Sequence, residues 1–365
     1  MPDSIKQPYR IVFTGGNTAG HVVPNIPLIT AFKELGWDIH YLGTIKGVEG
    51  KLIPSLGVTF HSIKSGKLRR YFALKNATDV FLTLLGITQA LRILLNVRPK
   101  VIFSKGGFVS VPVILAGWAL RVPIVAHESD VTLSLSTRIA LRLARRVCCA
   151  FERTARLYPG ARITVTGLPI RPCILSCDRN IAAERLKFVS GRPILLVLGG
   201  SLGASKINQA VRAALPELVT KFDVVHITGS EAQSDLTSPG YVQLKEVYDG
   251  FGDILAAAQI VVSRAGATVL HELFAARKPA VLIPLSLQVS RGDQVRNAAY
   301  AADCGYAEVL QEEDLLLPGR LAETVTTMQR NLSRYNEALV RYVPIDGTRE
   351  IMNVIFEIVK NQHGK

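Results

Sequence analysis

The stretch that decides the fold reads Ile11-Val12-Phe13-Thr14-Gly15-Gly16-Asn17-Thr18-Ala19-Gly20-His21. A short apolar run, typical of a strand, leads into a glycine-rich turn, and an apolar helical pattern follows at residues 26–35. This order suits phosphate binding, because glycines let the backbone approach a ligand and a helix N-terminus presents unpaired N–H groups. The glycine spacing alone is a weak signal.

The loop ends in a histidine, which a simple dinucleotide-binding fingerprint lacks. His21 stands where the loop meets the helix, and the ordinary pKa of histidine lies near neutrality. A general base could therefore act at this position. A histidine that only caps or packs the turn is the alternative, and the loop by itself does not separate the two.

Short apolar runs that end in glycine or polar residues continue outward from this loop. We expect strands at residues 37–43, 57–63, 100–104, 123–130 and 162–166, and a basic helix at 137–146. A second glycine pair, Gly106-Gly107, follows strand 100–104. Strands that alternate with helices predict a parallel sheet whose ligands bind beyond the carboxyl ends of the strands.

The second half of the chain repeats this opening. An apolar strand at 193–198 leads into a glycine loop at 199–205 and a helix at 207–219. A later strand at 259–263 runs into a small-residue turn and a helix that carries His271 and Glu272. Such a helix can hold nucleotide phosphates at its N-terminus, and the carboxylate can bind two ribose hydroxyls. Glu272 could equally be a carboxylate that the helix dipole stabilises.

We therefore predict an α/β protein with two facing Rossmann-like domains, each built on a parallel sheet, and an interdomain cleft. A chain of 365 residues suits two domains. The expected domains are residues 1–170 and 193–345, with a linker at 171–192. A C-terminal helix at 346–365 can pack back on the first domain.

The positive charge is concentrated in one half of the chain. The net charge is +14, and residues 1–170 hold 22 Lys and Arg against 8 Asp and Glu, whereas residues 171–365 hold 21 of each. This asymmetry predicts an anionic partner for the first half, which could be nucleic acid, a phosphate-rich substrate or an anionic membrane surface.

The cysteines and the N-terminal residues carry no sign of export or of a metal site. The five cysteines have no defensible disulfide or zinc spacing: Cys148, Cys149, Cys173, Cys177 and Cys304. Residues 1–10 are polar and lack the apolar core of a signal peptide. We expect free thiols and a protein that stays in the cytoplasm.

Two apolar runs approach membrane length. The first, at 80–95, contains Gln89 and Arg92, and the second, at 108–120, is too short to span a bilayer. A basic and aromatic cluster at 67–72 precedes the first run. The run could hold the protein on an anionic membrane surface, or it could be a buried helix behind a solvated basic loop.

Six motifs in order carry a resemblance to a known family. They are the His21 loop and residues 104–112, 127–130, 199–204, 263–272 and 291–297. On these motifs the sequence resembles the MurG family, the cell-wall N-acetylglucosaminyltransferases of glycosyltransferase family 28. The resemblance covers nearly the whole chain, and six ordered motifs are far more specific than any one.

The resemblance implies the GT-B fold and an inverting transfer of N-acetylglucosamine in peptidoglycan synthesis. The donor is UDP-N-acetylglucosamine and the acceptor is undecaprenyl-pyrophosphoryl-N-acetylmuramoyl-pentapeptide. It further implies a peripheral protein on the cytoplasmic face of the cell membrane, with partners among cell-wall synthesis proteins and roles in cell shape and cell division. We expect no nucleic-acid partner and no cofactor.

The resemblance also assigns residues to each substrate. For the donor it implies Thr18, Ala19, Gly20, Asp130, Arg171, Ser201, Arg264, Ala267, Thr268, Val269, Leu270, His271, Glu272 and Gln294. For the acceptor pyrophosphate it implies the two glycine pairs, Gly15-Gly16 and Gly106-Gly107.

An inverting transferase needs a base for the acceptor hydroxyl and a positive environment for the departing UDP. His21 is the candidate base, with Glu128 as its partner or competitor. The chain has no Asp-x-Asp motif, and helix N-termini with Arg264 or Arg171 could neutralise the diphosphate. We therefore expect no metal requirement.

The sequence departs from the family pattern at Asn17, Leu168 and residues 133–137, all on the acceptor side. A related GT-B glycosyltransferase with another lipid or natural-product acceptor is therefore the alternative. A nucleic-acid-binding protein would leave the glycine loops unexplained, and the basic residues form no recognised module. A dinucleotide-dependent oxidoreductase would need a Gly-x-Gly-x-x-Gly loop, and neither Gly-Gly loop has that spacing.

Overall fold

The computed structural model describes most of the chain. The described residues are 8–16, 18–66, 75–175 (without the side chains of 75–77), 177, 181–182, 186, 188, 191–199, 205–229, 236–247, 249–287 and 290–361. The chain divides into two compact units: unit 1 comprises Met1–Pro169 and Ile345–Lys365, and unit 2 comprises Ile170–Pro344. The basic cluster expected at 67–72 and Ser201 lie outside the described residues.

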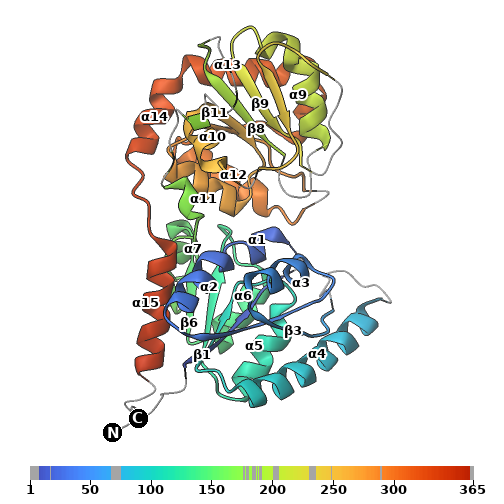
Figure 1. The fold of residues 1–365 in the computed structure, drawn as a ribbon, viewed down its shortest axis with the longest axis vertical. Helices are drawn as coiled ribbons and strands as arrows, with labels where there is room; N and C mark the ends of the chain where they lie inside the picture. The colour runs from blue at the N-terminus through green and yellow to red at the C-terminus, as the bar shows by residue number, and fades with distance from the viewer. Residues whose placement is uncertain are drawn as a thin grey trace. The chain divides into compact units, whose positions relative to one another are not determined.

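Unit 1 is built on a seven-stranded parallel sheet (Figure 1). Its strands are β1 (Arg10–Thr14), β2 (Asp38–Gly43), β3 (Thr59–Ser62), β4 (Val101–Ser104), β5 (Ile124–Glu128), β6 (Arg146–Cys149) and β7 (Ile163–Val165). Their spatial order is β3-β2-β1-β4-β5-β6-β7. From β1 the chain adds β2 and β3 on one side of the sheet, and it then returns to add β4 to β7 on the other side. This is the doubly wound arrangement expected from the alternating pattern.

Helices cover both faces of this sheet. They are α1 (Ala19–Val22), α2 (Asn25–Glu34), α3 (Val48–Leu52), α4 (Lys75–Val97), α5 (Ser110–Ala119), α6 (Leu135–Leu143), α7 (Glu152–Leu157) and α15 (Gly347–Lys360), with a 3₁₀ turn at Pro54–Leu56. Successive residues of β1 point to opposite faces. Phe13 packs with α2 and α15, and Val12 packs with α4, α5 and α6.

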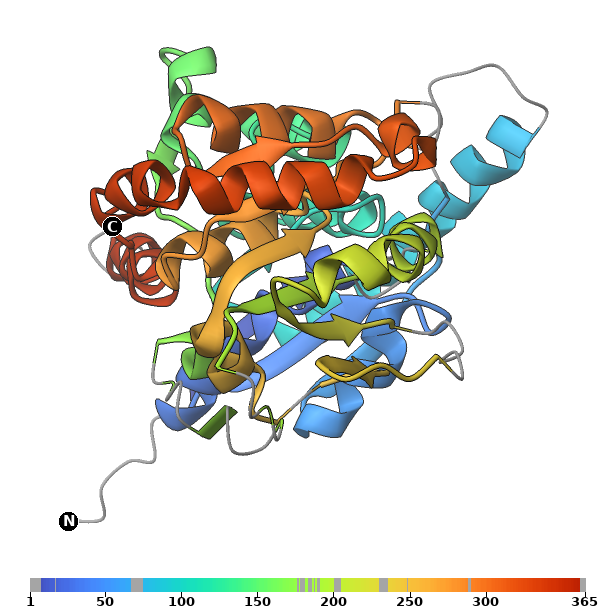
Figure 2. The same ribbon diagram turned by 90° about the horizontal axis from the view of Figure 1, so that it is seen from above.

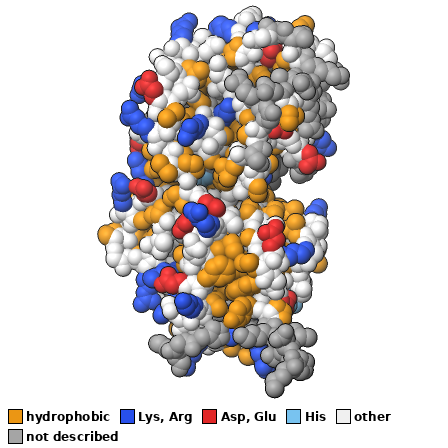
Figure 3. Space-filling view, turned by 60° about the vertical axis from the view of Figure 1, so that its left-hand side comes forward, with side chains coloured by type: hydrophobic (Ala, Val, Ile, Leu, Met, Phe, Trp, Pro, Cys, Tyr) orange, Lys and Arg blue, Asp and Glu red, His pale blue; other side chains and the backbone are white. Residues whose placement is uncertain are grey.

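The helix α15 contributes to the core of unit 1, although it is far from the sheet in sequence. Ile351 and Ile355 are fully buried in the same cluster as Ile11 and Phe13. Around α15 some apolar side chains also reach the surface, such as Phe356, which is 37% exposed. Figure 3 shows hydrophobic side chains gathered on this face of unit 1.

Unit 2 repeats the architecture with a six-stranded parallel sheet in the order β10-β9-β8-β11-β12-β13. Its strands are β8 (Ile194–Leu198), β9 (Asp223–Ile227), β10 (Tyr241–Leu244), β11 (Ala258–Ser263), β12 (Ala280–Leu282) and β13 (Ala307–Val309). Its helices are α9 (Ser205–Leu218), α10 (Phe251–Ala257), α11 (Ala267–Ala275), α12 (Asp293–Asp303), α13 (Arg320–Arg330) and α14 (Leu332–Val340), with 3₁₀ turns at Pro172–Ile174 and Glu312–Leu316.

The helices of unit 2 flank its strands on both sides (Figure 2). Val197 and Ile260 belong to a core cluster with side chains of α9 and α13. The sheet of unit 2 therefore buries apolar residues beneath these helices, and its carboxyl edge is left to loops. Unit 1 has the same arrangement, with helices over the sheet faces and loops at the carboxyl edge.

One expected helix is confirmed, but it ends earlier than predicted. The basic helix expected at 137–146 ends at Leu143, and Arg146 begins strand β6. Four residues, Arg146–Cys149, pair in parallel with β5 and β7. A strand this short has no readable alternation, and the basic helical pattern before it runs directly into it. The strands β10 and β13 were missed for the same reason.

Candidate functional site

The reversal of strand order in unit 1 lies between β1 and β4, where the loops that follow the two strands diverge. These loops contain the two glycine pairs. We call Gly15–Thr18 the first glycine loop, of which Asn17 is not described, and Lys105–Gly107 the second glycine loop. The backbone N–H of Lys105 donates to the carbonyl of Thr14 at 2.8 Å, which joins the two loops at their base.

His21 lies on α1 against the second glycine loop. Its Nδ1 is 2.8 Å from Oγ1 of Thr18. A side chain at Gly107 would stand 3.5 Å from Nδ1 of His21 and 2.8 Å from the carbonyl oxygen of Gly16. Gly107 also has a φ of +79°, which side chains rarely tolerate. Glycine at this position therefore lets the imidazole and both glycine loops come together.

A buried carboxylate supports the first glycine loop from behind. Glu49 on α3 is 0% exposed, and its Oε1 accepts from the backbone N–H and the hydroxyl of Thr44 at 3.1 and 2.6 Å. A side chain at Gly16 would collide with this carboxylate at 2.3 Å. The second glycine of the first pair is therefore required by close packing inside the protein.

Glu128 ends β5 and is 3% exposed. Its Oε1 accepts from the backbone N–H groups of Ser129 and Asp130 at 3.0 and 3.2 Å, and its Oε2 accepts from that of Ser134 at 2.7 Å. We call Ser129–Ser134 the β5–α6 loop. Both carboxylate oxygens of Glu128 thus hold this loop.

In unit 2 the strand order reverses between β8 and β11. Part of the loop after β8 lies outside the described residues. The loop after β11 leads into α11. Gly266 is the N-cap residue of this nine-residue helix. Among the described residues, nothing lies within 4 Å of the place where a side chain of Gly266 would stand. A side chain would therefore have room at this helix start, and a helix N-terminus favours anions.

Glu272 lies six residues after Gly266 on α11 and pairs with Arg171. The guanidinium donates two hydrogen bonds to the carboxylate, Nε to Oε1 at 2.7 Å and Nη2 to Oε2 at 2.8 Å. Arg171 also lies over the ring of Phe251 at 4.3 Å. Burial lowers the pKa of Arg171, but the hydrogen bonds and charge of Glu272 outweigh it and raise the pKa above its ordinary value.

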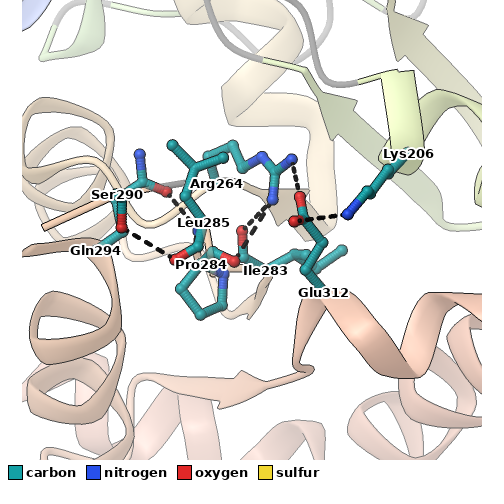
Figure 4. A network of polar contacts seen from close by, with 8 residues as sticks. All are labelled: Lys206, Arg264, Ile283, Pro284, Leu285, Ser290, Gln294 and Glu312. Atoms are coloured by element: carbon teal, nitrogen blue, oxygen red, sulfur yellow. Dashed lines mark hydrogen bonds and ion pairs between the residues drawn. The ribbon is translucent and has the colours of Figure 1, made fainter. Parts of the chain in front are cut away.

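Arg264 is turned toward the interior of unit 2 (Figure 4). Its guanidinium donates to the carbonyl of Ile283 at 3.2 Å and to Glu312 at 2.5 Å. Lys206 on α9 donates to the other oxygen of Glu312 at 3.1 Å. Although burial raises the pKa of Glu312, the hydrogen bonds from Arg264 and Lys206 lower it below its ordinary value.

Gln294 on α12 belongs to the same region (Figure 4). Its Oε1 accepts from the backbone N–H of Leu285 at 3.1 Å, and the hydroxyl of Ser290 donates to the carbonyl of Leu285 at 3.3 Å. Asn297, one turn further, donates to the carbonyl of Ala265 at 3.2 Å. The helix α12 thus braces the loop that precedes α11.

Comparisons with known proteins agree with this architecture. The model of the glycosyltransferase family 28 N-terminal domain matches residues 11–149, and that of the family 28 C-terminal domain matches residues 194–341. The chain is 43% identical to the UDP-N-acetylglucosamine–N-acetylmuramyl-(pentapeptide) pyrophosphoryl-undecaprenol N-acetylglucosamine transferase of Lachnospira eligens, over 95% of this chain and 98% of the relative.

The chain belongs to glycosyltransferase family 28.

Solved structures support the GT-B fold of this family 28 chain. The MurG of Acinetobacter baumannii matches with a TM-score of 0.74 and 23% identity, over 96% of this chain and 100% of that one. The calicheamicin glycosyltransferase CalG4 matches with a TM-score of 0.71 and 14% identity, over 97% and 99%. At these identities the two structures speak for the fold alone.

The residues expected at the family 28 site fall into two groups, one in each unit. Those in unit 1 are Gly15, Gly16, Thr18, Ala19, Gly20, His21, Gly106, Gly107, Glu128 and Asp130, and those in unit 2 are Arg171, Arg264, Ala267, Thr268, Val269, Leu270, His271, Glu272 and Gln294. Not all of them border open space. Ala267, Leu270, His271 and Glu272 on α11 are all buried, at 6%, 0%, 6% and 3% exposed, and His271 packs against Phe274.

Sequence reasoning missed two buried charged residues of this family 28 unit, Lys105 and Glu49. Lys105 is 1% exposed and stands directly before Gly106-Gly107. The sequence signal for Lys105 was its position between an apolar strand and a glycine pair. A charged residue is rarely buried without a partner, so a lysine at such a position suggests a specific contact. Glu49 had no comparable signal in the sequence.

All five cysteines are free thiols, as expected. Among the described residues, no group of three His, Cys, Asp or Glu side chains is arranged to hold a metal ion.

Helix α4 is a long apolar helix of the family 28 N-terminal domain. Over Thr78–Val97 it is long and apolar enough to cross a membrane by length and composition, with a mean hydropathy of 1.8, and 28% of this stretch is buried inside the protein. Core helices pass the same test. Ala90 and Leu94 lie in the core of unit 1, whereas Phe81 is 67% exposed and Leu84 is 56% exposed.

Proposed function

We propose that this chain transfers N-acetylglucosamine from UDP-N-acetylglucosamine to undecaprenyl-pyrophosphoryl-N-acetylmuramoyl-pentapeptide in peptidoglycan synthesis. The observation that carries the proposal is the 43% identity, across 95% of the chain, to a relative named for this reaction. The geometry of the two units supports it, because each unit presents glycine-rich or helix-terminal backbone at the point where its strand order reverses.

In this proposal unit 1 receives the acceptor. The first and second glycine loops take the pyrophosphate, since backbone N–H groups can approach it where side chains are absent. His21 is the base for the acceptor hydroxyl. If Nδ1 of His21 donates to Thr18, whose Oγ1 is 2.8 Å away, the proton-accepting nitrogen is Nε2. Thr18 would then set the imidazole tautomer that the reaction needs.

Unit 2 receives the donor. The N-terminus of α11 at Ala267, Thr268 and Val269 takes the diphosphate, and Glu272 takes the ribose hydroxyls. Arg171 holds the Glu272 carboxylate by two hydrogen bonds, which orients the oxygens before the nucleotide arrives. Gln294 contributes toward the sugar and Ser201 toward the phosphates, whereas Arg264, which the sequence also offered for the phosphates, is bonded to Glu312. Thr18, Ala19, Gly20 and Asp130 are the donor contacts proposed from unit 1.

The proposed reaction is a single displacement. The acceptor hydroxyl oxygen forms a bond to the anomeric carbon of N-acetylglucosamine as the bond from that carbon to the UDP oxygen breaks. His21 takes the hydroxyl proton, and the electron pair of the broken bond leaves on UDP. Because Arg264 is bonded to Glu312 and to backbone carbonyls, we assign the main stabilisation of the departing UDP to the backbone N–H groups of α11.

A lipid-linked acceptor requires access to a membrane, and we propose that unit 1 binds the cytoplasmic face of the cell membrane as a peripheral protein. Two observations support this. The exposed face of α4 carries apolar side chains such as Phe81 and Leu84. The residues of unit 1 hold the entire positive excess, with 25 Lys and Arg against 11 Asp and Glu, and anionic lipids attract such a surface.

The deciding experiment measures release of UDP from UDP-N-acetylglucosamine by the purified protein in detergent, with and without the undecaprenyl-pyrophosphoryl muramoyl-pentapeptide and with EDTA present. We expect release that depends on the acceptor and persists in EDTA. Release that EDTA abolishes would contradict the metal-independent mechanism. Donor binding without acceptor-dependent release would point instead to a related transferase with another acceptor.

A further inference from the structure

Lys105 is a buried cation in the middle of the acceptor unit, and the proposed reaction leaves it without a role. The residue follows β4 and opens the second glycine loop. Its side chain is 1% exposed and is among the largest fully buried side chains of the protein. A lysine is almost never buried to this degree unless it is paired, so its partners indicate its purpose.

The ammonium group of Lys105 contacts two residues at the end of β5. Nζ lies 3.0 Å from Nδ1 of His127 and donates to the hydroxyl of Ser129. His127 in turn has its Nε2 2.8 Å from the carbonyl oxygen of Gly167. A carbonyl can only accept, so Nε2 of His127 carries a proton and Nδ1 is the acceptor for Lys105.

These hydrogen bonds connect the loops that surround the proposed acceptor position. Ser129 begins the β5–α6 loop, which Glu128 holds by three backbone hydrogen bonds. On its other side, Cβ of Lys105 would lie only 3.0 Å from a side chain at Gly15 in the first glycine loop. Lys105 therefore touches the first glycine loop, is part of the second and is bonded to the β5–α6 loop.

The β5–α6 loop reaches the same place from the other direction. Ser136, just after this loop, has its Oγ 3.4 Å from the place where a side chain of Gly106 would stand. That place is also 3.7 Å from Cδ2 of His21. The helix α6, the second glycine loop and the imidazole therefore meet around Gly106, and Lys105 is the neighbouring residue that ties them together.

We propose that Lys105 is a positioning residue of the transferase: its buried ammonium group fixes the second glycine loop to the β5–α6 loop and so sets the place of the acceptor pyrophosphate relative to His21. The inference rests on the proposed function, because it gives these loops the acceptor. Lys105 touches no reacting atom in this proposal.

The charges around Lys105 make its role sensitive to pH. Burial lowers the pKa of Lys105 to about 8, against the charges of Glu128, Asp130 and Cys148, which raise it. The other titratable group in contact is His127, which accepts from it. Above about pH 8 the ammonium group loses its proton, and the carboxylates of Glu128 and Asp130 lose their buried counter-charge.

The test compares Lys105→Met, Lys105→Arg and, as a matched control, Lys51→Met on the exposed surface of α3. For Lys105→Met we expect the kcat/KM for the lipid-linked acceptor to fall at least 10-fold, while the Kd for UDP stays within twofold of the wild type. In the wild type, kcat/KM for the acceptor should fall above about pH 8. This fall should be absent from Lys105→Met. Lys105→Arg should recover part of the activity and should also lack the fall. Lys51→Met should match the wild type.

A second measurement does not depend on catalysis. In hydrogen exchange by mass spectrometry, Lys105→Met should lose protection at residues 106–110 and 129–134 by at least 10-fold, with unit 2 unchanged. Wild-type kinetics and protection in Lys105→Met would overturn the inference and leave the proposed function intact. If the wild type itself releases no UDP, the proposed function fails, and the exchange data still decide whether Lys105 holds the loops. If Lys105→Met does not fold, Ser129→Ala replaces it, and an unchanged pH profile and protection there would overturn the inference.

Discussion

The histidine at the loop junction is the residue on which the mechanism depends. His21→Ala should lower kcat by about 100-fold or more, because a positioned base contributes this much to a proton transfer. The Kd for UDP should change less than twofold, measured by calorimetry. His61→Ala, on the edge strand β3, is the matched control. Unchanged turnover in His21→Ala would remove this residue from the mechanism.

The carboxylate of Glu272 gives the corresponding prediction for the donor. Glu272→Gln removes a charged acceptor, and hydrogen bonds to charged groups contribute roughly 1.5–3 kcal/mol. We expect the Kd for UDP to rise about 10-fold or more, with little change in the Kd for the acceptor. Glu217→Gln, at an exposed position of α9, should bind UDP normally. A normal Kd for UDP in Glu272→Gln would refute the ribose assignment.

The burial of Lys105 predicts how stability depends on pH. The pKa of Lys105 is about 8 in the folded protein, below the roughly 10.4 of an unfolded chain. Between these values the unfolded state binds more protons, so this group makes the free energy of unfolding rise with pH. The whole effect is about 3 kcal/mol, at 1.36 kcal/mol per pKa unit.

Denaturant titrations at pH 7.5 and pH 10.5 check this prediction. The wild type should gain stability relative to Lys105→Met as the pH rises, because the variant lacks the buried charge. Lys51→Met should follow the wild type at both values. An equal difference between wild type and Lys105→Met at the two pH values would mean that Lys105 does not lose its proton in this window.

At the scale of elements, α4 combines a buried and an exposed apolar face. Replacing Phe81 and Leu84 together by Ser should lower binding to vesicles of anionic lipid by about 10-fold or more, because each side chain loses roughly 1 kcal/mol of apolar burial in the membrane. The melting temperature should hardly change, since both side chains are exposed. Leu316→Ser, 80% exposed in unit 2, is the control. Normal vesicle binding in the double variant would exclude α4 as the membrane contact.

The elements that the sequence predicted best are the long or strongly apolar ones. The strand at β1 and the helix that follows, at residues 26–35, were expected from the pattern, and the structure has them at Arg10–Thr14 and Asn25–Glu34. The strands that it missed have three or four residues. In β6 and β13 the hydrogen bonds of the neighbouring strands and burial under helices decide the conformation, and neither can be read from so few residues.

At the scale of the whole molecule, the charge distribution predicts salt dependence. The positive excess of unit 1 should attract anionic vesicles, and salt screens such exposed charges, with a Debye length of about 10 Å at 0.1 M and 3 Å at 1 M. Vesicle binding should therefore weaken several-fold between 0.05 M and 0.5 M NaCl in a sedimentation assay. Neutral vesicles should show little change. Salt-independent binding to anionic vesicles would mean that apolar contact alone holds the protein on the membrane.

The sequence by itself determined the fold class, the repeat of a strand, a Gly-Gly loop and a helix, and the family. These follow from local pattern and motif order, since a glycine pair after an apolar run indicates close backbone approach wherever it occurs. It also indicated the candidate residues His21, Glu128 and Glu272 by their positions after strands or at helix starts.

The tertiary structure alone decided what these side chains contact. It bonds Glu128 to three backbone N–H groups of its own loop and turns Arg264 inward to Glu312. It also pairs Arg171 with Glu272, 101 residues further along the chain, and brings Lys105 to Ser129. The physical reason is that hydrogen bonding and burial depend on which loops the sheet topology brings together, and residues far apart in sequence carry no local sign of it.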